Sequence, residues 1–282
     1  MRLSIRHTTR YRFSEPVVHA LQRLRLTPKE TQGQEIVSWE MEYDNASPEL
    51  TYEDQHHNTT TLVSVDSEAS IVTITCRGEV NTSDHAGVIG QHAGHLPLWS
   101  FCSQSDLTRP GPKMRALATE MRGRDLGPLD MLHALSAEIL DRVEYRIGST
   151  GVDTKGEEAL GKGAGVCQAH AHIFIGAARM LDIPARYVSG YLMMDDRVEQ
   201  DATHAWTEAY VEGLGWVGFD ISNGISPDQR YVRVATGRDY RDAAPVTGIS
   251  FGTASQELEV EVAVEQRQVQ QFLLALLFQP SI

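Results

Sequence analysis

The sequence has few cysteines, an excess of acidic over basic residues and no long hydrophobic run. The chain has three cysteines, at positions 76, 102 and 167 of 282. So small and odd a number does not indicate a disulfide framework. The chain has 25 Lys and Arg against 38 Asp and Glu, a net charge of −13, whereas nucleic-acid binding needs a basic face. We therefore expect reduced thiols and no nucleic-acid partner.

Apolar segments are short throughout the chain. The longest, FLLALLF at residues 272–278, falls far below the roughly 20 residues that span a bilayer. The N-terminal MRLSIRHTTRYRF lacks the apolar region of a secretory signal. We predict a cytoplasmic protein with no membrane partner, in which FLLALLF docks on an apolar surface of the same chain. The oligomeric state stays open, because a partner surface is the alternative docking site for this segment.

Common metal and phosphate motifs are missing as well. The chain has no CxxC and no HExxH, and GKGAG at 161–165 lacks the spacing and the GK[ST] ending of a phosphate loop. His170 and His172 are two residues apart, so they do not face each other on a helix. The histidines at 56–57 and 92–95 are expected in loops, solvated. We predict no metal site and no cofactor.

Residues 1–80 contain several segments with the alternation or β-branched content of strands. These segments are LSIRHTTRYRF, LQRLRLTP, IVSWEMEYD and SIVTITCRGEV. Cys76 alternates with Ile74 in the last of them and is interpreted as a buried apolar residue. Regular short strands over this length predict a small β-sandwich. Residues 81–110, rich in Gly, His, Ser and Pro, are interpreted as a linker and domain junction.

Helical patterns follow the linker. Two amphipathic stretches are predicted over 112–123 and 128–143, and a third helix runs from 167 to about 181. The apolar faces of the first two consist of Met114, Leu117, Ala118 and Met121, and of Leu129, Leu132, Leu135, Ile139 and Val143.

Strand patterns return after Pro184, in ARYVSGYLMM, HAWTEAYVE and GWVGFDIS, with a turn at 212–215 between the last two. A terminal strand is predicted over 257–264, with Leu258, Val260, Val262 and Val264 on one face. The order of elements predicts an α+β architecture in two domains. The first is a β-sandwich over residues 1–100, and the second spans residues 101–282.

Cys167 combines several features of a reactive thiol. It follows Gly161, Gly163 and Gly165 and opens a predicted helix, whose N-terminal dipole stabilises a thiolate. Its backbone N–H would be free to bind an oxyanion, and glycines such as Gly165 let a substrate backbone approach closely. Taken alone, the residue is most simply a small core side chain, and a metal ligand is the weaker alternative.

A cysteine nucleophile needs a base, and that base needs an orienting group. His204 begins one predicted strand after Cys167, and Asp220 ends the next. With a turn at 212–215, His204 and Asp220 are expected at nearly the same level of adjacent antiparallel strands, within about 5 Å. The three residues in this order favour chemistry over the packing or capping role that each would have alone.

Three ordered segments carry a resemblance to a known family. GVCQAHAHIFIGAARMLDIPARYVSGYL, HAWTEAYVEGLGWVGFDISNG and GRDYRDAAPVTG resemble the bacterial transglutaminase-like superfamily and its cysteine protease members. YRFSEPV, RLRLTP and the D-x-x-x-N of residues 54–58 are similar to the β domain that precedes this core in bacterial members. The likeness covers nearly the whole chain. It implies a papain-like core, with helices packed on an antiparallel sheet, behind the N-terminal β-sandwich.

The resemblance also implies roles, with Cys167 as the nucleophile, His204 as its base and Asp220 as the orienting group. Two departures from the family pattern concern the surroundings of these residues. Ala169 and His170 stand where many relatives have an Asp after the Cys-Gln pair. Ile221 follows Asp220 where relatives often have Pro-Thr, which would change how Asp220 is held.

We predict acyl transfer through a thioester, with the oxyanion bound by the Cys167 N–H and a second donor from Gln168, Trp206 or Tyr145. Hydrolysis of a peptide, isopeptide or related amide bond comes first, because water is always present. A protein-glutamine gamma-glutamyltransferase, which crosslinks to an amine acceptor, needs a site that excludes water. A non-catalytic peptide-binding module and a metal-dependent hydrolase are the remaining alternatives. The expected partner is a peptide or protein amide.

Overall fold

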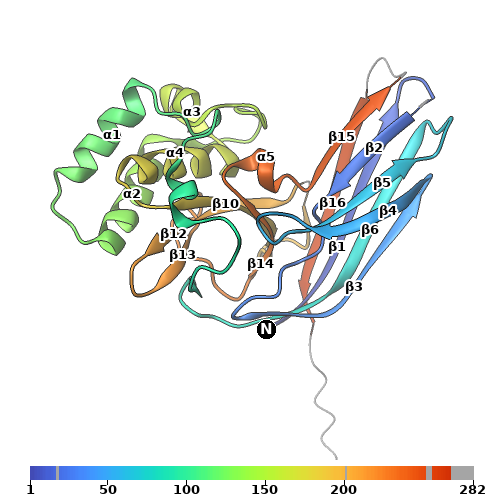
Figure 1. Ribbon diagram of the computed structural model, residues 1–282, viewed down its shortest axis with the longest axis horizontal. Coiled ribbons are helices and arrows are strands. Elements are labelled where there is room, and N and C mark those ends of the chain that lie inside the picture. The colour runs from blue at the N-terminus through green and yellow to red at the C-terminus, as the bar shows by residue number, and fades with distance from the viewer. Residues whose placement is uncertain (17–18, 201, 252–255, 268–282) are drawn as a thin grey trace, which may run out of the picture.

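The computed structural model describes residues 1–16, 19–200, 202–251 and 256–267. Its two parts lie side by side, a helical part and a long β part (Figure 1). The FLLALLF segment at 272–278 lies outside the described residues. Within the described part of the chain, no helix has the length and apolar character needed to cross a bilayer.

The β part is a sandwich of two antiparallel sheets, with strand orders β11-β16-β1-β6-β3 and β15-β2-β5-β4. Apolar side chains from alternating positions of the strands fill the space between the sheets, and Cys76 is fully buried among them, as predicted. The strands are β1 (Arg2–Phe13), β2 (His19–Leu24), β3 (Gln34–Asp44), β4 (Ala46–Glu53), β5 (Thr59–Val65), β6 (Ile71–Thr82), β11 (Glu199–Gln200), β15 (Val246–Phe251) and β16 (Gln256–Gln266).

The C-terminal strands return to this sandwich. β16 pairs with β1 along its whole length, from Leu3 opposite Gln266 to Phe13 opposite Gln256, and β15 pairs with β2. The predicted terminal strand is therefore confirmed. This strand lies in a sheet of the sandwich. The predicted domain boundary at residue 100 instead placed it in the second domain.

The helical part is built on a central antiparallel sheet of order β14-β10-β12-β13-β7, with helices on one face. This α+β arrangement confirms the predicted fold class. Its elements are β7 (Val88–Gly90), η1 (Leu98–Cys102), α1 (Pro112–Arg122), α2 (Pro128–Arg142), β8 (Glu144–Tyr145), α3 (Gly156–Lys162), β9 (Ala164–Gly165), α4 (Cys167–Met180), β10 (Ala185–Leu192), β12 (His204–Val211), β13 (Gly215–Phe219), β14 (Tyr231–Gly237) and α5 (Tyr240–Ala243).

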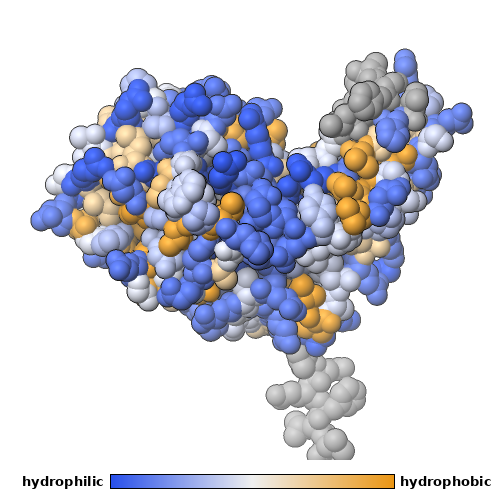
Figure 2. All heavy atoms as spheres, viewed as in Figure 1, coloured by the Kyte–Doolittle hydropathy of each residue, from blue (hydrophilic) through white to orange (hydrophobic). Residues whose placement is uncertain are grey.

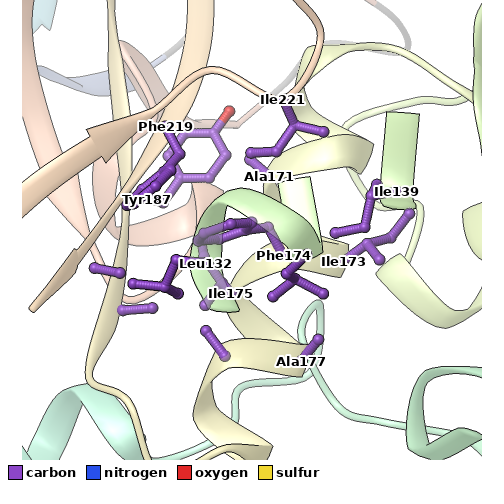
Figure 3. Packing of buried hydrophobic residues seen from close by; sticks show 14 of the residues in the cluster. Leu132, Ile139, Ala171, Ile173, Phe174, Ile175, Ala177, Tyr187, Phe219 and Ile221 are labelled. Atoms are coloured by element: carbon purple, nitrogen blue, oxygen red, sulfur yellow. The ribbon is translucent and has the colours of Figure 1, made fainter. Parts of the chain in front are cut away.

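Helix α4 is the centre of this part, surrounded by α1, α2, α3 and the sheet. Phe174 contacts Phe219 of β13, and the labelled side chains of Figure 3 come from α4 itself and from the elements packed around it. The small residues of α4 permit close packing. A Cβ on Gly176 would lie 2.4 Å from the Thr108 carbonyl oxygen and 2.5 Å from the Met114 sulfur. The alanine-rich helix is thus a buried axis that fixes the position of its first residue.

Both amphipathic helices occur where predicted, and only Leu129 of their apolar faces is less than fully buried. Other details differ from the prediction. Residues 161–162 were predicted in a loop but form the last residues of helix α3. Gly163 caps this helix in the left-handed conformation, with φ 69°. The linker over 81–110 also adds β7 to the edge of the central sheet. Strands β4 and β5 have no counterpart among the predicted strands; β4 is almost entirely exposed, so its sequence carries no apolar alternation.

The D-x-x-x-N stretch joins the two parts of the molecule. The Asp54 carboxylate accepts hydrogen bonds from the backbone N–H groups of His56 and Asn58 and from Arg25. This turn presents the Asn58 amide to β14, where it bonds both the N–H and the carbonyl of Thr236, each at 2.8 Å. A buried, fully paired amide therefore fixes the sandwich against the central sheet.

Candidate active site

Cys167 is the first residue of α4 and is 6% exposed. The N–H groups of the first turn, including that of Cys167, have no partner within the helix, as in any helix. No side chain at the N-cap position, Val166, bonds them either. The preceding strand β9 pairs in parallel with β8, with Tyr145 beside Gly165. Glycine is required there, because a Cβ on Gly165 would lie 2.8 Å from the Cβ of Ala169. The loop therefore fixes a thiol at the positive end of a helix dipole.

His204 begins β12, and Asp220 follows directly after β13. Thr207 lies opposite Phe219, so Asp220 is level with Trp206, and His204 is on the diagonal. The expected alignment is therefore two residues off, but diagonal neighbours are still within reach of each other. His204 Nε2 donates to Asp220 Oδ2 at 2.6 Å.

The thiol of Cys167 also interacts with this imidazole and helps to raise its pKa. Because Nε2 is used by Asp220, Nδ1 is the nitrogen left for the sulfur. The histidine thus lies between the thiol and the carboxylate, and all three side chains are buried or nearly so. The structure brings together the three residues that the sequence singled out.

Opposing effects act on the charge of His204. Burial lowers its pKa, but the charge of Asp220 and the hydrogen bonds to Asp220 and Cys167 outweigh burial and raise the pKa to about 10. Burial likewise raises the pKa of Asp220, and the attraction of His204 with three side-chain hydrogen bonds lowers it overall. An imidazolium–carboxylate pair is therefore the stable form at neutral pH.

Two residues that sequence analysis missed hold Asp220 in place. The Tyr231 hydroxyl and the Asn223 amide donate to Oδ2 at 2.7 and 2.6 Å, and the Asn223 backbone N–H donates to Oδ1 at 3.3 Å. Asn223 lies three residues after Asp220, as expected for a turn, but Tyr231 comes from β14. Ile221, the residue after Asp220, is buried in the core. The donors from Asn223 and Tyr231 therefore hold Asp220 without the Pro-Thr pair of the family pattern.

Tyr231→Phe removes one donor to Asp220 without changing the shape of the side chain. We expect kcat to fall about 10-fold, because a hydrogen bond to a charged group contributes about 1.5 kcal/mol or more. The loss of turnover at alkaline pH should also begin at a lower pH than in wild type, because Asp220 would be held less firmly against His204. Tyr240→Phe is the matched control and should keep the wild-type pH profile; a Tyr231→Phe profile identical to wild type would contradict this role.

The three candidates for a second oxyanion donor differ in position. Gln168 is adjacent to the sulfur, with its Oε1 at 3.7 Å from Cys167 Sγ. Tyr145 is 46% exposed, and its pKa is raised by partial burial and by the nearby charges of Cys167 and Asp220. The Trp206 indole stacks beside the His204 ring at 6.2 Å, and its buried Nε1 has no hydrogen-bond partner among the described residues.

The two histidines of α4 are structural. His170 Nε2 donates to the Val143 carbonyl at 2.9 Å, and its Nδ1 is 2.8 Å from the Ser222 hydroxyl. His172 Nε2 accepts from the Tyr240 N–H, and burial lowers its pKa to about 4. Both side chains are buried, and neither belongs to a group of potential metal donors among the described residues. His170 thus ties Ser222, near Asp220, to the residue that follows α2.

One group of described residues brings potential metal donors together. Glu53, His57 and His95 each offer a donor atom, and these atoms lie within 4.8 Å of one another. His57 Nδ1 is hydrogen bonded to Glu53, and its ring stacks on His95 at 4.9 Å. The group lies at the loops of the sandwich and the linker, and shares no residue with the Cys167 site.

Two family models match the chain. The description Bacterial transglutaminase-like N-terminal region matches residues 3–81, and Transglutaminase-like superfamily matches residues 115–221, a range that contains the site. An uncharacterized protein of Mycobacterium tuberculosis is 30% identical over 296 residues, covering 94% of this chain and 92% of the relative. The chain belongs to the transglutaminase-like superfamily. An uncharacterized protein of Mycobacterium leprae is 26% identical and covers 93% of this chain and 98% of its own length.

Two further relatives of this transglutaminase-like chain have descriptive names. The crystal structure of a "Putative Cysteine Protease" from Cytophaga hutchinsonii matches with a TM-score of 0.75 at 22% identity, over 95% of this chain and 92% of that one. At this identity the match shows the fold. A protein-glutamine gamma-glutamyltransferase of Pseudomonas aeruginosa is 28% identical over 132 residues, 42% of this chain but 19% of that protein.

Proposed function

We propose that this protein hydrolyses a peptide, isopeptide or related amide bond through a thioester on Cys167. The observation that supports the proposal is the position of the His204 ring, which is hydrogen bonded to Asp220 and also interacts with the Cys167 thiol. A side chain that served only packing would need neither partner. The alternative of a non-catalytic module gains no support from this arrangement.

In the first half-reaction, the Cys167 sulfur attacks the amide carbonyl carbon, and its proton resides on His204. Negative charge develops on the carbonyl oxygen, where the unpaired N–H of Cys167 can bind it. His204 then gives its proton to the amide nitrogen, the C–N bond breaks, and an amine or ammonia leaves. The acyl group remains on sulfur as a thioester.

In the second half-reaction, His204 takes a proton from water, whose oxygen attacks the thioester carbon. The C–S bond breaks, the carboxylic acid leaves and the thiol regains its proton from His204. Asp220 keeps the ring oriented and stabilises its positive charge in both halves. An amine in place of water would give a new amide, and the similarity to the Pseudomonas aeruginosa transferase favours this as the second candidate.

A glutamine-containing peptide, incubated with and without a primary amine and analysed by mass spectrometry, tests the proposal. We expect deamidated or cleaved peptide whether or not the amine is added. An amine adduct as the main product would establish crosslinking instead. The same reactions with Cys167→Ala report any background, and product formed equally by that variant would contradict catalysis at this thiol.

A further inference from the structure

A cavity of about 640 Å³ lies where the sandwich meets the central sheet, on the sheet face opposite α4. Ala185 and Tyr187 of β10 pack toward α4, so Arg186 between them points to the other face. On β14 a register shift opposite Ser189 and Gly190 brings Arg233 to that same face. The cavity walls include none of Cys167, His204 or Asp220.

Basic side chains line the inner wall of this cavity without matching acidic partners. Arg186 and Arg233 share a single carboxylate, that of Glu208, which is fully buried. Arg186 Nε is 2.7 Å from Glu208 Oε2, and Arg233 uses Nε and Nη2, at 2.5 and 3.0 Å. Two guanidinium groups against one carboxylate leave a buried surplus of positive charge.

Lys29 adds a third positive group to the same wall. Its Nζ donates to the carbonyl oxygens of His56 and His57, at 2.9 and 2.5 Å, which are neutral acceptors. The buried carboxylate of Asp54, close by, is already paired with Arg25 at 2.9 Å. Burial and the repulsion of the two arginines lower the pKa of Lys29 to about 7. An anion in the cavity would relieve this repulsion.

The acidic residues of the cavity lie at its edge. Glu30 and Glu53 line it but are exposed, and Glu53 is hydrogen bonded to His57. Hydrophilic residues cover much of the face seen in Figure 2, and the whole chain carries a net charge of −13. A concentration of unmatched positive charge inside so acidic a protein is costly unless something negative binds there.

We propose that this cavity binds a small molecule through a carboxylate or phosphate group held by Lys29, Arg186 and Arg233. Its volume lies within the range of small-molecule sites, roughly 300 to 1,000 Å³. Arg186 lies over the Trp216 ring, with its Cζ 3.9 Å from the ring centroid, and among the described residues only its Nε has a hydrogen-bond partner. A planar guanidinium fixed in this way is suited to a bidentate oxyanion.

The inference does not depend on the proposed reaction, so binding alone tests it. Thermal unfolding of the full chain is followed while inorganic phosphate or citrate is added, with sodium chloride at equal ionic strength as the reference. We expect a saturable rise in Tm with phosphate or citrate and none with chloride. Citrate alone would identify a carboxylate ligand, and phosphate alone a phosphorylated one. No saturable rise with either anion would overturn the proposal.

Lys29→Gln locates the binding. The variant keeps N–H donors near the two carbonyl oxygens and removes the charge, so the affinity for the anion should fall at least 5-fold. Lys162→Gln, an equal change of charge on the exposed end of α3, should leave the affinity unchanged. Equal affinities in Lys29→Gln and wild type would show an adventitious ion only and would overturn the proposal.

A measurement on the wild-type chain covers the case in which Lys29→Gln does not fold. The chain has only four lysines, Lys29, Lys113, Lys155 and Lys162. Acetylation with acetic anhydride near neutral pH, read by peptide mass, compares them in one sample. Phosphate or citrate should protect Lys29 several-fold relative to the other three. Acetylation of Lys29 that the anions leave unchanged, at any level, would count against the site.

Discussion

Cys167→Ala should lose at least about 10⁴-fold in kcat while keeping the fold. The sulfur is the atom that forms the thioester, and removal of a covalent nucleophile costs about this much or more in related mechanisms. The replacement removes one sulfur atom at the first position of α4, at the end of the hydrophobic cluster, so Tm should change by only a few degrees. Turnover of a peptide or glutamine amide, with circular dichroism of the same sample, checks both statements.

A second thiol provides the control for this variant. Cys102→Ala changes a thiol that is outside the site and should retain wild-type turnover. Residual activity in Cys167→Ala comparable to that of Cys102→Ala would exclude Cys167 as the nucleophile.

Asp220→Asn should reduce kcat by about 10³-fold or more, because the negative charge that holds His204 protonated and oriented is lost. Burial would then dominate, and the pKa of His204 would fall from about 10. The wild-type enzyme should keep its activity as pH rises until His204 deprotonates near that value. In the variant, the alkaline decline should begin at a lower pH.

The same pair affects stability in a defined direction. The pKa of His204 is raised in the folded state, so its contribution to the free energy of unfolding is complete below the unfolded value, about 6.5, and is lost as pH rises through about 10. Asp220→Asn should therefore lower Tm more at pH 7 than at pH 10.5. Asp196→Asn removes an exposed carboxylate paired with Arg197 and should change neither activity nor this pH dependence. A uniform loss of Tm at both pH values would contradict the linkage.

The sequence predicts the core elements well because their hydrophobic pattern is strong. Met114, Leu117 and Met121 recur at helical spacing and are fully buried. Strand β4 escapes prediction because it is exposed along most of its length and contains Pro48. The return of β16 to β1 depends on pairing across the whole chain, and no local pattern encodes a partner that is more than 240 residues away.

For the site, residue type and order were enough to single out Cys167, His204 and Asp220. Sequence could not reveal the two-residue offset between His204 and Asp220, which depends on the register of β12 and β13. It also missed Tyr231, because a tyrosine in a strand is an ordinary core residue until β14 places it beside Asp220. The charged cavity likewise depends on a register shift in β14 and on the docking of the sandwich.

His204 and Asp220 should activate the thiol of Cys167. The rates at which iodoacetamide alkylates each of the three thiols at pH 7, resolved by peptide mass, measure this activation. Burial raises the pKa of Cys76 to about 12 and also raises that of Cys102, so both should react slowly. Cys167 should react at least about 10-fold faster than Cys102 in wild type and should lose this advantage in Asp220→Asn. Cys167 reacting no faster than Cys102 in wild type would contradict it.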